Sequence, residues 1–497
     1  MKSTQYAIPN TQYDKRIDWK NYALFSIAVV IFAYIITRDV TLPKEVLLPI
    51  AGLGLMTLVF ASFKNPQFSL LLLIAYLPFS KQLVGQFGAG IVGLNLSNIL
   101  LIIVIFGWIV HSLIYGEKIF SKNWLNPIIL LFCLWGFFTL IRARLMYGEY
   151  YALEDFFILF KRWITPIFLY FIGLNMVKDK PTFKKVVFVI MLATLIVALM
   201  AVRDYMHYGD QGSMEESRIG GVFEQPNMLG AFLVYNMFFF LTFLLYYWRS
   251  FKYWLLLIPF VVCFRGIMVT FSRGAYMAFA FGAVMTSFFR SKILFVIVLF
   301  LTACAVLSPL YLPAGIRNRM AATFNGGQVI STDLEEIKDP SATSRLLIWK
   351  GAIEMIKAQP LFGFGYGTFP YVIGGYVPEA PDMDAHNTYL ILAAEMGIPS
   401  LAIFLVILLT LIIHAWWLLL KTKDRYFKAF ALGMLGGIFG LLVANMFGSR
   451  LNSEEVSSYF WILSGLLMRA VIMRRQEISS GYSSGGRGQG TGYRKNE

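Results

Sequence analysis

The sequence contains few of the residues that build metal centres or disulfide frameworks. Its 497 residues include only three cysteines and four histidines. Cys133, Cys263 and Cys304 lie far apart, each inside an apolar run, and they lack the spacing typical of metal ligands. We therefore expect neither a disulfide framework nor a metal site, and we interpret the cysteines as small buried hydrophobic residues.

Charge is also scarce, and this decides the class of protein. Only 14% of the residues are charged, whereas 58% are hydrophobic. A water-soluble globule cannot hide so much apolar surface, so lipid must be the solvent. The net charge of +15 does not indicate nucleic-acid binding, because most basic residues sit in short segments between apolar runs.

These apolar runs are mostly close to the roughly 20 residues that a helix needs to cross a hydrocarbon core about 30 Å thick. Fourteen candidate spans lie at residues 22–37, 45–63, 67–80, 94–115, 124–141, 156–177, 186–202, 228–247, 253–271, 275–289, 293–312, 398–420, 429–446 and 456–473. The polar N-terminus has no cleavage site for a signal peptidase, so the first span is expected to stay in the membrane. The predicted fold is an all-α, polytopic integral membrane protein with about 12–14 transmembrane helices.

Basic residues predict the orientation of the chain. If the N-terminus is cytoplasmic, the cytoplasmic segments hold 25 Lys and Arg residues, whereas the short segments on the other side hold 9. The positive-inside rule applies to short segments, so both termini are expected in the cytoplasm. Two external segments are then long enough to carry chemistry, at residues 203–227 and 313–397.

The predicted organisation is one membrane domain, residues 1–475, followed by a tail. The large external loop 313–397 belongs to the membrane domain. Residues 476–497 are rich in Gly and Ser with scattered Arg, so we expect a disordered cytoplasmic tail.

Inside the large loop, residues 344–357 have the spacing of an amphipathic helix. Its predicted apolar face consists of Leu346, Trp349, Ile353 and Ile356. Pro360 marks the expected end of the helix.

Two arginines lie where predicted spans meet the external side. Arg218 belongs to the segment SRIGGVFEQPN, and Arg273 belongs to a tight turn with the sequence FSRG. An arginine presents a planar fork of donors that suits phosphate oxygens. The alternative for both residues is an interfacial side chain that only anchors the protein in the membrane.

One histidine has a more suggestive setting than the other three. His386 lies in the sequence DAHNTYL, just before the last group of predicted spans. Histidine can take up and return protons near neutral pH, and Asp382 or Asp384 could orient its ring. A loop histidine without a role is the alternative.

Two patterns resemble metal or nucleotide motifs and are not favoured as such. Asp382 and Asp384 have the carboxylate spacing that some sugar-nucleotide enzymes use for a divalent metal, but nucleotide sugars are expected only in the cytoplasm. The glycines between residues 363 and 367 do not lie between a strand and a helix, so a tight turn after Pro360 is preferred to a phosphate loop.

Three basic residues fall inside predicted spans, where charge is costly. For Lys161 and Arg162 we favour pairing with Glu154 or Asp155, or snorkelling to the interface. Arg265 has no acidic residue near it in sequence, so its partner is not indicated.

Taken together, four segments of the chain resemble the superfamily of O-antigen ligases and O-antigen polymerases, which are bacterial membrane glycosyltransferases. They are SRIGGVFEQPN at 217–227, FSRG at 271–274, SRLLIWKGAIEMIKAQPLFGFGYGTF at 344–369 and DAHNTYLILAAEMGIPSLAIF at 384–404. The last two are the most specific. The resemblance covers roughly residues 200–470, and the earlier spans match only in their hydrophobic character.

The resemblance implies a metal-independent, inverting enzyme of the bacterial inner membrane that needs no cofactor. It would transfer a glycan from an undecaprenyl-diphosphate carrier to an acceptor at the periplasmic face, within membrane lipid and without nucleic acid. By motif, Arg218 and Arg273 would bind the diphosphate, with Arg345 as a weaker third candidate, and His386 would be catalytic. A diphosphate is a good leaving group whose charge arginines can neutralise.

The acceptor distinguishes the remaining alternatives. A ligase would transfer the glycan to lipid A-core, and a polymerase would extend a glycan chain; the sequence names neither acceptor, and we prefer the ligase. A transporter or flippase of lipid-linked glycan is the alternative of another class. Transporters place ionisable residues near the bilayer midplane, which would suit Arg265, but most notable residues here lie in external segments.

Overall fold

The structure is a computed structural model that describes residues 59, 62–63, 65–83, 96–148, 153–208, 218–307 and 340–485. The chain divides into two compact units, Met1–Leu58 and Val59–Glu497, and every described residue belongs to the second. The predicted span 22–37 and most of the span 45–63 therefore lie outside the described residues.

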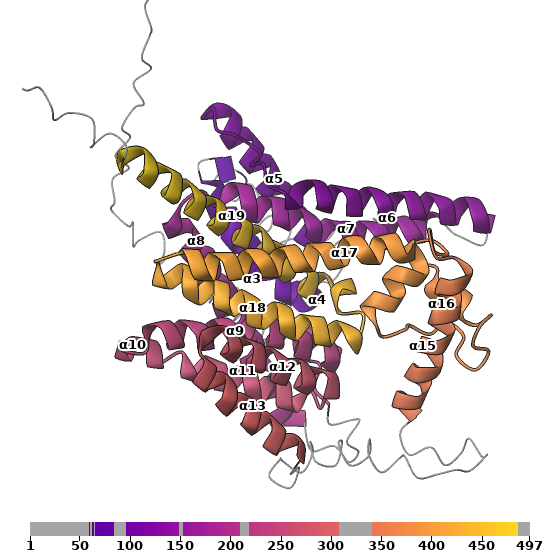
Figure 1. Ribbon diagram of the computed structural model, residues 1–497. Helices are drawn as coiled ribbons and strands as arrows, with labels where there is room; N and C mark the ends of the chain where they lie inside the picture. The colour runs from indigo at the N-terminus through magenta and orange to yellow at the C-terminus, as the bar shows by residue number, and fades with distance from the viewer. Residues whose placement is uncertain are drawn as a thin grey trace, which may run out of the picture. The chain divides into compact units, whose positions relative to one another are not determined.

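The described residues form helices and no strands (Figure 1). The first half contains α3 (Pro66–Tyr76), η1 (Leu77–Phe79), α4 (Ser80–Leu83), α5 (Leu96–Ile114), α6 (Leu125–Tyr147), α7 (Leu153–Met176), α8 (Lys180–Tyr208), η3 (Gly221–Phe223) and α9 (Pro226–Tyr247). The second half contains α10 (Phe251–Trp254), α11 (Leu257–Val269), α12 (Arg273–Arg290), α13 (Lys292–Leu307), α15 (Pro340–Ala358), α16 (Phe369–Ile373), α17 (Thr388–Lys421), α18 (Arg425–Met446), η7 (Arg450–Asn452) and α19 (Glu454–Gly485).

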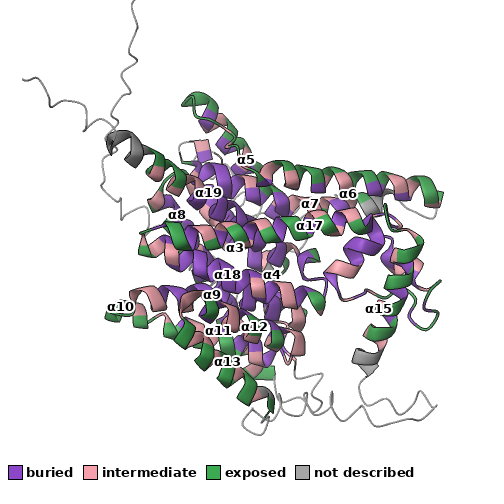
Figure 2. Ribbon diagram, in the orientation of Figure 1, coloured by how far each residue is buried: buried purple, intermediate pink, exposed green. Residues whose placement is uncertain are grey.

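Nine helical stretches in the described part are long and apolar enough to cross a membrane, and α3 and α13 are shorter apolar helices. This confirms the predicted class, an all-α polytopic membrane protein. Within the second unit, α9, α18 and α19 are mostly buried, whereas α5, α6 and α13 expose large apolar side chains (Figure 2). An apolar exterior around a buried helical core is the arrangement that lipid as solvent requires.

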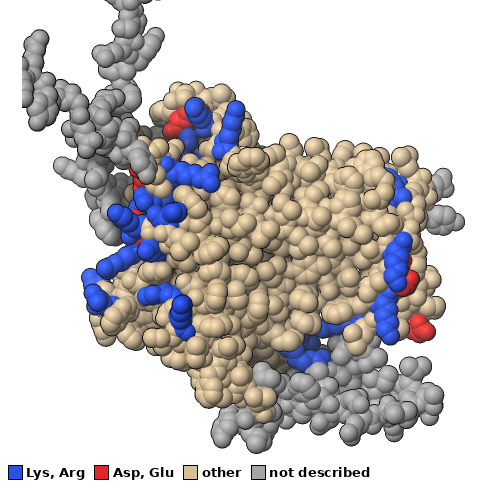
Figure 3. Space-filling model, in the orientation of Figure 1, with Lys and Arg blue, Asp and Glu red and all other residues tan. Residues whose placement is uncertain are grey.

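Basic side chains gather at one end of these helices (Figure 3). Lys180 at the start of α8 forms an ion pair with Asp424, and the Nε of Arg474 donates to the carbonyl of Lys421 at 2.9 Å. Lys184 lies over the ring of Tyr426. All three cations are among the residues that the positive-inside count assigns to the cytoplasm. The orientation itself stays a prediction.

The amphipathic helix of the large loop is confirmed as α15, but only half of its predicted apolar face packs against the protein. Trp349 and Ile356 are partly buried, whereas Leu346 and Ile353 are 58% and 44% exposed. The fully buried apolar residues of α15 are Ile348, Ala352 and Met355, which pack on α16 and on the first turns of α17. The sequence of a helix with two apolar stripes does not show which stripe packs against the rest of the protein.

A break inside α17 separates the loop from the following span. Gly397 has φ +80°, and a Cβ at this position would lie 2.2 Å from the carbonyl oxygen of Leu361. Only glycine combines this backbone angle with such a close approach. The kink coincides with the predicted start of the span at residue 398, and the helical residues 388–396 before it belong to the candidate site.

The tail begins later than we expected. The last helix, α19, continues to Gly485, so residues 476–485 are helical rather than disordered, and residues 486–497 lie outside the described residues. The cysteine interpretation is correct for Cys263, which is buried, but Cys304 is exposed on the outer helix α13.

The basic residues inside predicted spans have neighbours that are distant from them in the sequence. The guanidinium of Arg265 lies 5.1 Å from the ring centre of Tyr205, and the Arg265 side chain faces outward from α11. Lys161 and Arg162 lie close enough to Glu454 to interact with its charge, a residue almost 300 positions away in the sequence. The suggested partners, Glu154 and Asp155, lie outside the described side chains.

Candidate functional site

Arg218 and Arg273 are held by one hydrogen-bonded scaffold. The Oδ1 atom of Asn227 accepts hydrogen bonds from Nη2 of Arg218 at 3.1 Å and from Oγ of Ser272 at 2.7 Å. Ser272 also caps α12, whose first residue is Arg273. The Nε of Arg218 donates to the carbonyl of Thr270 at 3.2 Å. Two arginines from separate motifs are thus fixed close together at the positive end of α12.

His386 pairs with Asp384 beside the loop between α18 and α19. The Nδ1 atom of His386 lies 3.3 Å from Oδ2 of Asp384, and Oγ of Ser449 donates to the same carboxylate at 2.9 and 3.1 Å. Burial alone would raise the pKa of Asp384, but the hydrogen bonds from His386 and Ser449 outweigh it, so the pKa is lowered. An ionised Asp384 can hold the imidazole with its Nε2 facing outward.

The loop around His386 is strained and firmly anchored. His386 has φ +48°, a left-handed conformation that costs about 1–3 kcal/mol for a residue other than glycine. The carbonyl of Ala385 accepts a hydrogen bond from Nε1 of Trp349 at 2.8 Å, and the Asn387 side chain caps α17. Because α15 and α17 together impose this conformation, His386 is presented with 45% of its side chain exposed.

Arg450 is a residue that the sequence analysis missed. It lies in η7 and is only 5% exposed, with Nη2 donating to the carbonyl of Phe447 at 2.6 Å. Its pKa is lowered to about 10, mainly by burial and also by the nearby charges of Arg345 and Arg218, against the influence of Asp384. Arg450 therefore lies close to Arg218, Arg345 and Asp384.

The turn that carries Arg450 contacts both the segment that contains Arg273 and the pair formed by Asp384 and His386. A Cβ on Gly448 would lie 1.9 Å from the guanidinium carbon of Arg450, so only glycine lets the side chain fold back over the turn. The Cβ of Phe447 lies 2.9 Å from the Cβ position of Gly274, beside Arg273. A short turn with the sequence GSRLN between the last two predicted spans was the signal that could have identified it.

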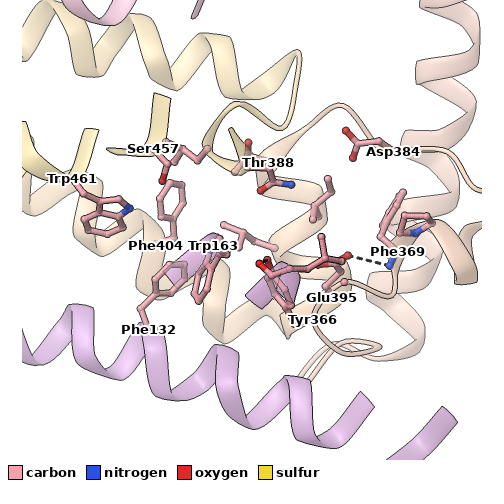
Figure 4. A pocket seen from close by; sticks show the side chains of 17 residues that line it. Phe132, Trp163, Tyr366, Phe369, Asp384, Thr388, Glu395, Phe404, Ser457 and Trp461 are labelled. Atoms are coloured by element: carbon pink, nitrogen blue, oxygen red, sulfur yellow. Dashed lines mark hydrogen bonds between the residues drawn. The ribbon is translucent and has the colours of Figure 1, made fainter. Parts of the chain in front are cut away.

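A cavity of about 260 Å³ lies on the other side of η7 (Figure 4). Its aromatic lining includes Phe132, Trp163, Phe404 and Trp461 from α6, α7, α17 and α19. Its polar lining includes Ser457, which lies beside Trp461 and Phe404, and Asp384, at the far side of the view from these rings. We call it the aromatic pocket.

The glycine-rich segment 363–367 is structural, as the tight-turn interpretation predicts. The backbone N–H groups of Phe364 and Gly365 donate to the carbonyls of Ala394 and Glu395 at 2.9 and 2.7 Å. The Glu395 carboxylate accepts the N–H of Phe369 at 3.0 Å. These N–H groups are therefore already used within the protein.

The pair Asp382 and Asp384 is not arranged as a joint metal site in the described part of the chain. Asp384 is committed to Ser449 and His386. No group of three or more His, Cys, Asp or Glu residues within the described ranges could hold a metal ion.

Comparison with known families supports the resemblance noted in the sequence. Residues 258–405 match the family model of O-antigen ligases. No curated protein gives a significant match to the chain. The match to the O-antigen ligase family includes Arg273, Arg345 and His386, whereas Arg218 and Arg450 lie outside the matched segment. An O-antigen ligase-like segment within a multi-pass membrane protein indicates a glycosyltransferase-like enzyme that acts on lipid-linked glycan and a glycan acceptor.

Proposed function

We propose that this protein transfers a glycan from an undecaprenyl-diphosphate carrier to an acceptor hydroxyl at the external face of the bacterial inner membrane. One observation carries the proposal: the turn 447–450 contacts both the arginine scaffold and the pair formed by Asp384 and His386. A phosphate-binding group and a proton acceptor are therefore close enough to act on one substrate.

In the proposed reaction, the acceptor hydroxyl attacks the anomeric carbon of the donor sugar. A bond forms between that carbon and the acceptor oxygen, and the bond from the carbon to the diphosphate oxygen breaks. His386 takes the hydroxyl proton through Nε2, while Asp384 stabilises the resulting imidazolium. The carrier leaves as undecaprenyl diphosphate, and attack opposite the leaving group inverts the configuration.

The arginines stabilise the charge that develops on the leaving diphosphate. Asn227 positions the guanidinium of Arg218, so its donors need little reorganisation when the charge appears. Arg273 follows Ser272 at the start of α12, on the same scaffold. Arg345 contributes to the same positive field, as its effect on Arg450 indicates. Arg450 extends this set, because a buried guanidinium beside other cations is compensated by a polyanionic ligand.

Lipid A-core is the acceptor that we favour, which makes the protein a ligase rather than a polymerase. The two activities share this chemistry. A transporter of lipid-linked glycan is less well supported, because Arg265, its best candidate residue, faces outward from α11 and lies beside Tyr205. A cation in that position suits the membrane interface better than a central pathway.

The deciding experiment is the cell-surface glycan profile of a strain that lacks the gene. Loss of all attached polymer supports a ligase, and attachment of a single repeat unit identifies a polymerase. Accumulation of lipid-linked glycan on the cytoplasmic side would instead support a flippase. Complementation with His386→Ala separates a catalytic from a transport role, because a transporter does not need the base.

A further inference from the structure

The aromatic pocket contains polar groups that no other part of the described chain uses. The side chains of Asn452 and Ser457 line it, and neither forms a hydrogen bond within the described ranges. Ser457 is 3% exposed, so its hydroxyl is close to the pocket rather than to bulk solvent. A hydroxyl and an amide that line a pocket without a protein partner are available to hydrogen-bond a ligand or water.

The pocket and the arginine cluster lie on opposite sides of η7. Arg450 contacts Met228 and Phe447, whereas the next two residues, Leu451 and Asn452, line the pocket. The acidic side chains of the pocket are Asp384 and Glu395. The pKa of Asp384 is lowered, so this side chain stays ionised, whereas burial raises the pKa of Glu395 to about 7. The negative charge of Asp384 disfavours a phosphate in the pocket, and the cations around Arg450 favour one there.

The pocket also adjoins the proposed base. Asp384 lines it, and Oδ2 of Asp384 lies 3.3 Å from Nδ1 of His386. A sugar in the pocket therefore lies beside the carboxylate that positions the base, although His386 itself does not line the pocket. The volume of the pocket, about 260 Å³, is close to the lower end of small-molecule sites, roughly 300–1,000 Å³. This volume suits one sugar ring rather than a long chain.

We propose that the aromatic pocket binds the terminal sugar of the acceptor. This inference rests on the proposed function. The aromatic rings of Trp163 and Phe404 pack against the apolar C–H face of the sugar, while Asn452 and Ser457 bond its hydroxyl groups. An isoprenoid chain would leave these polar groups unsatisfied, and a diphosphate would be repelled by the ionised carboxylate of Asp384.

The test compares Asn452→Ala and Ser457→Val with Ser458→Val, a matched control on the next residue of α19. Ser458 is equally buried but does not line the pocket. The acceptor probes are oligosaccharides released by mild acid from the surface of the source bacterium. With lipid-linked donor saturating, we expect the KM for these oligosaccharides to rise about 3- to 10-fold in each pocket variant, the range of one lost hydrogen bond. The dissociation constant of the donor should match that of the control.

An unchanged acceptor KM in both pocket variants would overturn the proposal. Weaker binding of the donor in the pocket variants would also overturn the proposal, because the pocket would then hold the carrier. Thermal stabilisation by the oligosaccharides without donor separates this inference from the proposed function. Stabilisation that is present in the wild type and lost in the pocket variants supports the pocket even if no transfer occurs, and no stabilisation of the wild type contradicts it.

Discussion

The hydroxyl of Ser449 donates to both carboxylate oxygens of Asp384, at distances of 2.9 and 3.1 Å. These residues are 65 positions apart and belong to different connecting segments. Ser449 therefore fixes the carboxylate on one side while His386 contacts it on the other. The turn that carries Ser449 also carries Arg450, so the histidine pair and the buried cation are positioned together.

The lowered pKa of Asp384 predicts how acid affects stability. Because the folded-state pKa lies below its ordinary value of 3.8, the ionised carboxylate stabilises the fold above that value. This contribution is lost as the pH falls through the folded-state pKa. The purified wild type should therefore lose more thermal stability between about pH 5 and pH 3 than Asp384→Asn. Equal acid sensitivity of the two proteins in thermal melts would contradict this assignment.

Replacing His386 should abolish transfer without preventing donor binding. A positioned general base contributes about 10²–10⁴-fold, and we expect His386→Ala to lose transfer by that factor. The measurement uses purified enzyme with saturating lipid-linked donor and acceptor, together with a separate donor titration. If His386 only forms a hydrogen bond to the substrate, the variant will bind the substrate poorly but turn it over normally at saturation.

Lysine should be a poor substitute for the two scaffold arginines. It offers a point charge instead of a planar fork, so Arg218→Lys and Arg273→Lys should each weaken donor binding by about tenfold or more. Arg265→Lys is the matched control, because Arg265 faces outward from α11. Wild-type transfer rates in both scaffold variants would rule out the phosphate-binding role.

Arg450 should bind the donor although it lies outside the matched family segment. Removal of a charge-assisted hydrogen bond costs about 1.5–3 kcal/mol, so Arg450→Met should raise the dissociation constant of the donor about 10- to 100-fold. Arg203→Met, which breaks only an exposed pair with Asp204, controls for general loss of positive charge. A lower melting temperature with donor affinity intact would show that Arg450 is purely structural.

The predicted orientation can be tested by labelling single cysteines in a protein that lacks Cys133, Cys263 and Cys304. Glu379 and Lys423 are both exposed, on the large loop and at the opposite end of α17. In spheroplasts, an impermeant thiol reagent should label Glu379→Cys, and should label Lys423→Cys only after permeabilisation. The reverse pattern would place the whole candidate site in the cytoplasm.

Sequence patterns were sufficient for the membrane class and for most helix positions. Long apolar runs exclude a soluble fold, and Pro360 marked the end of the amphipathic helix through the backbone angles that proline allows. The motifs around Arg218, Arg273 and His386 were also recognisable locally. Each of these features depends on residues that are close together in the chain.

Only the tertiary structure decided which residues meet. Ser449 reaches Asp384, Asn227 joins Arg218 to Ser272, and Arg450 lies near all these motifs because α9, α12, α17 and α18 pack side by side. The buried stripe of α15 was also decided in this way, since it depends on the position of α16 and not on the sequence of α15 alone. Local sequence fixes backbone preference and hydrophobic period, but contacts between distant segments arise only when whole helices pack.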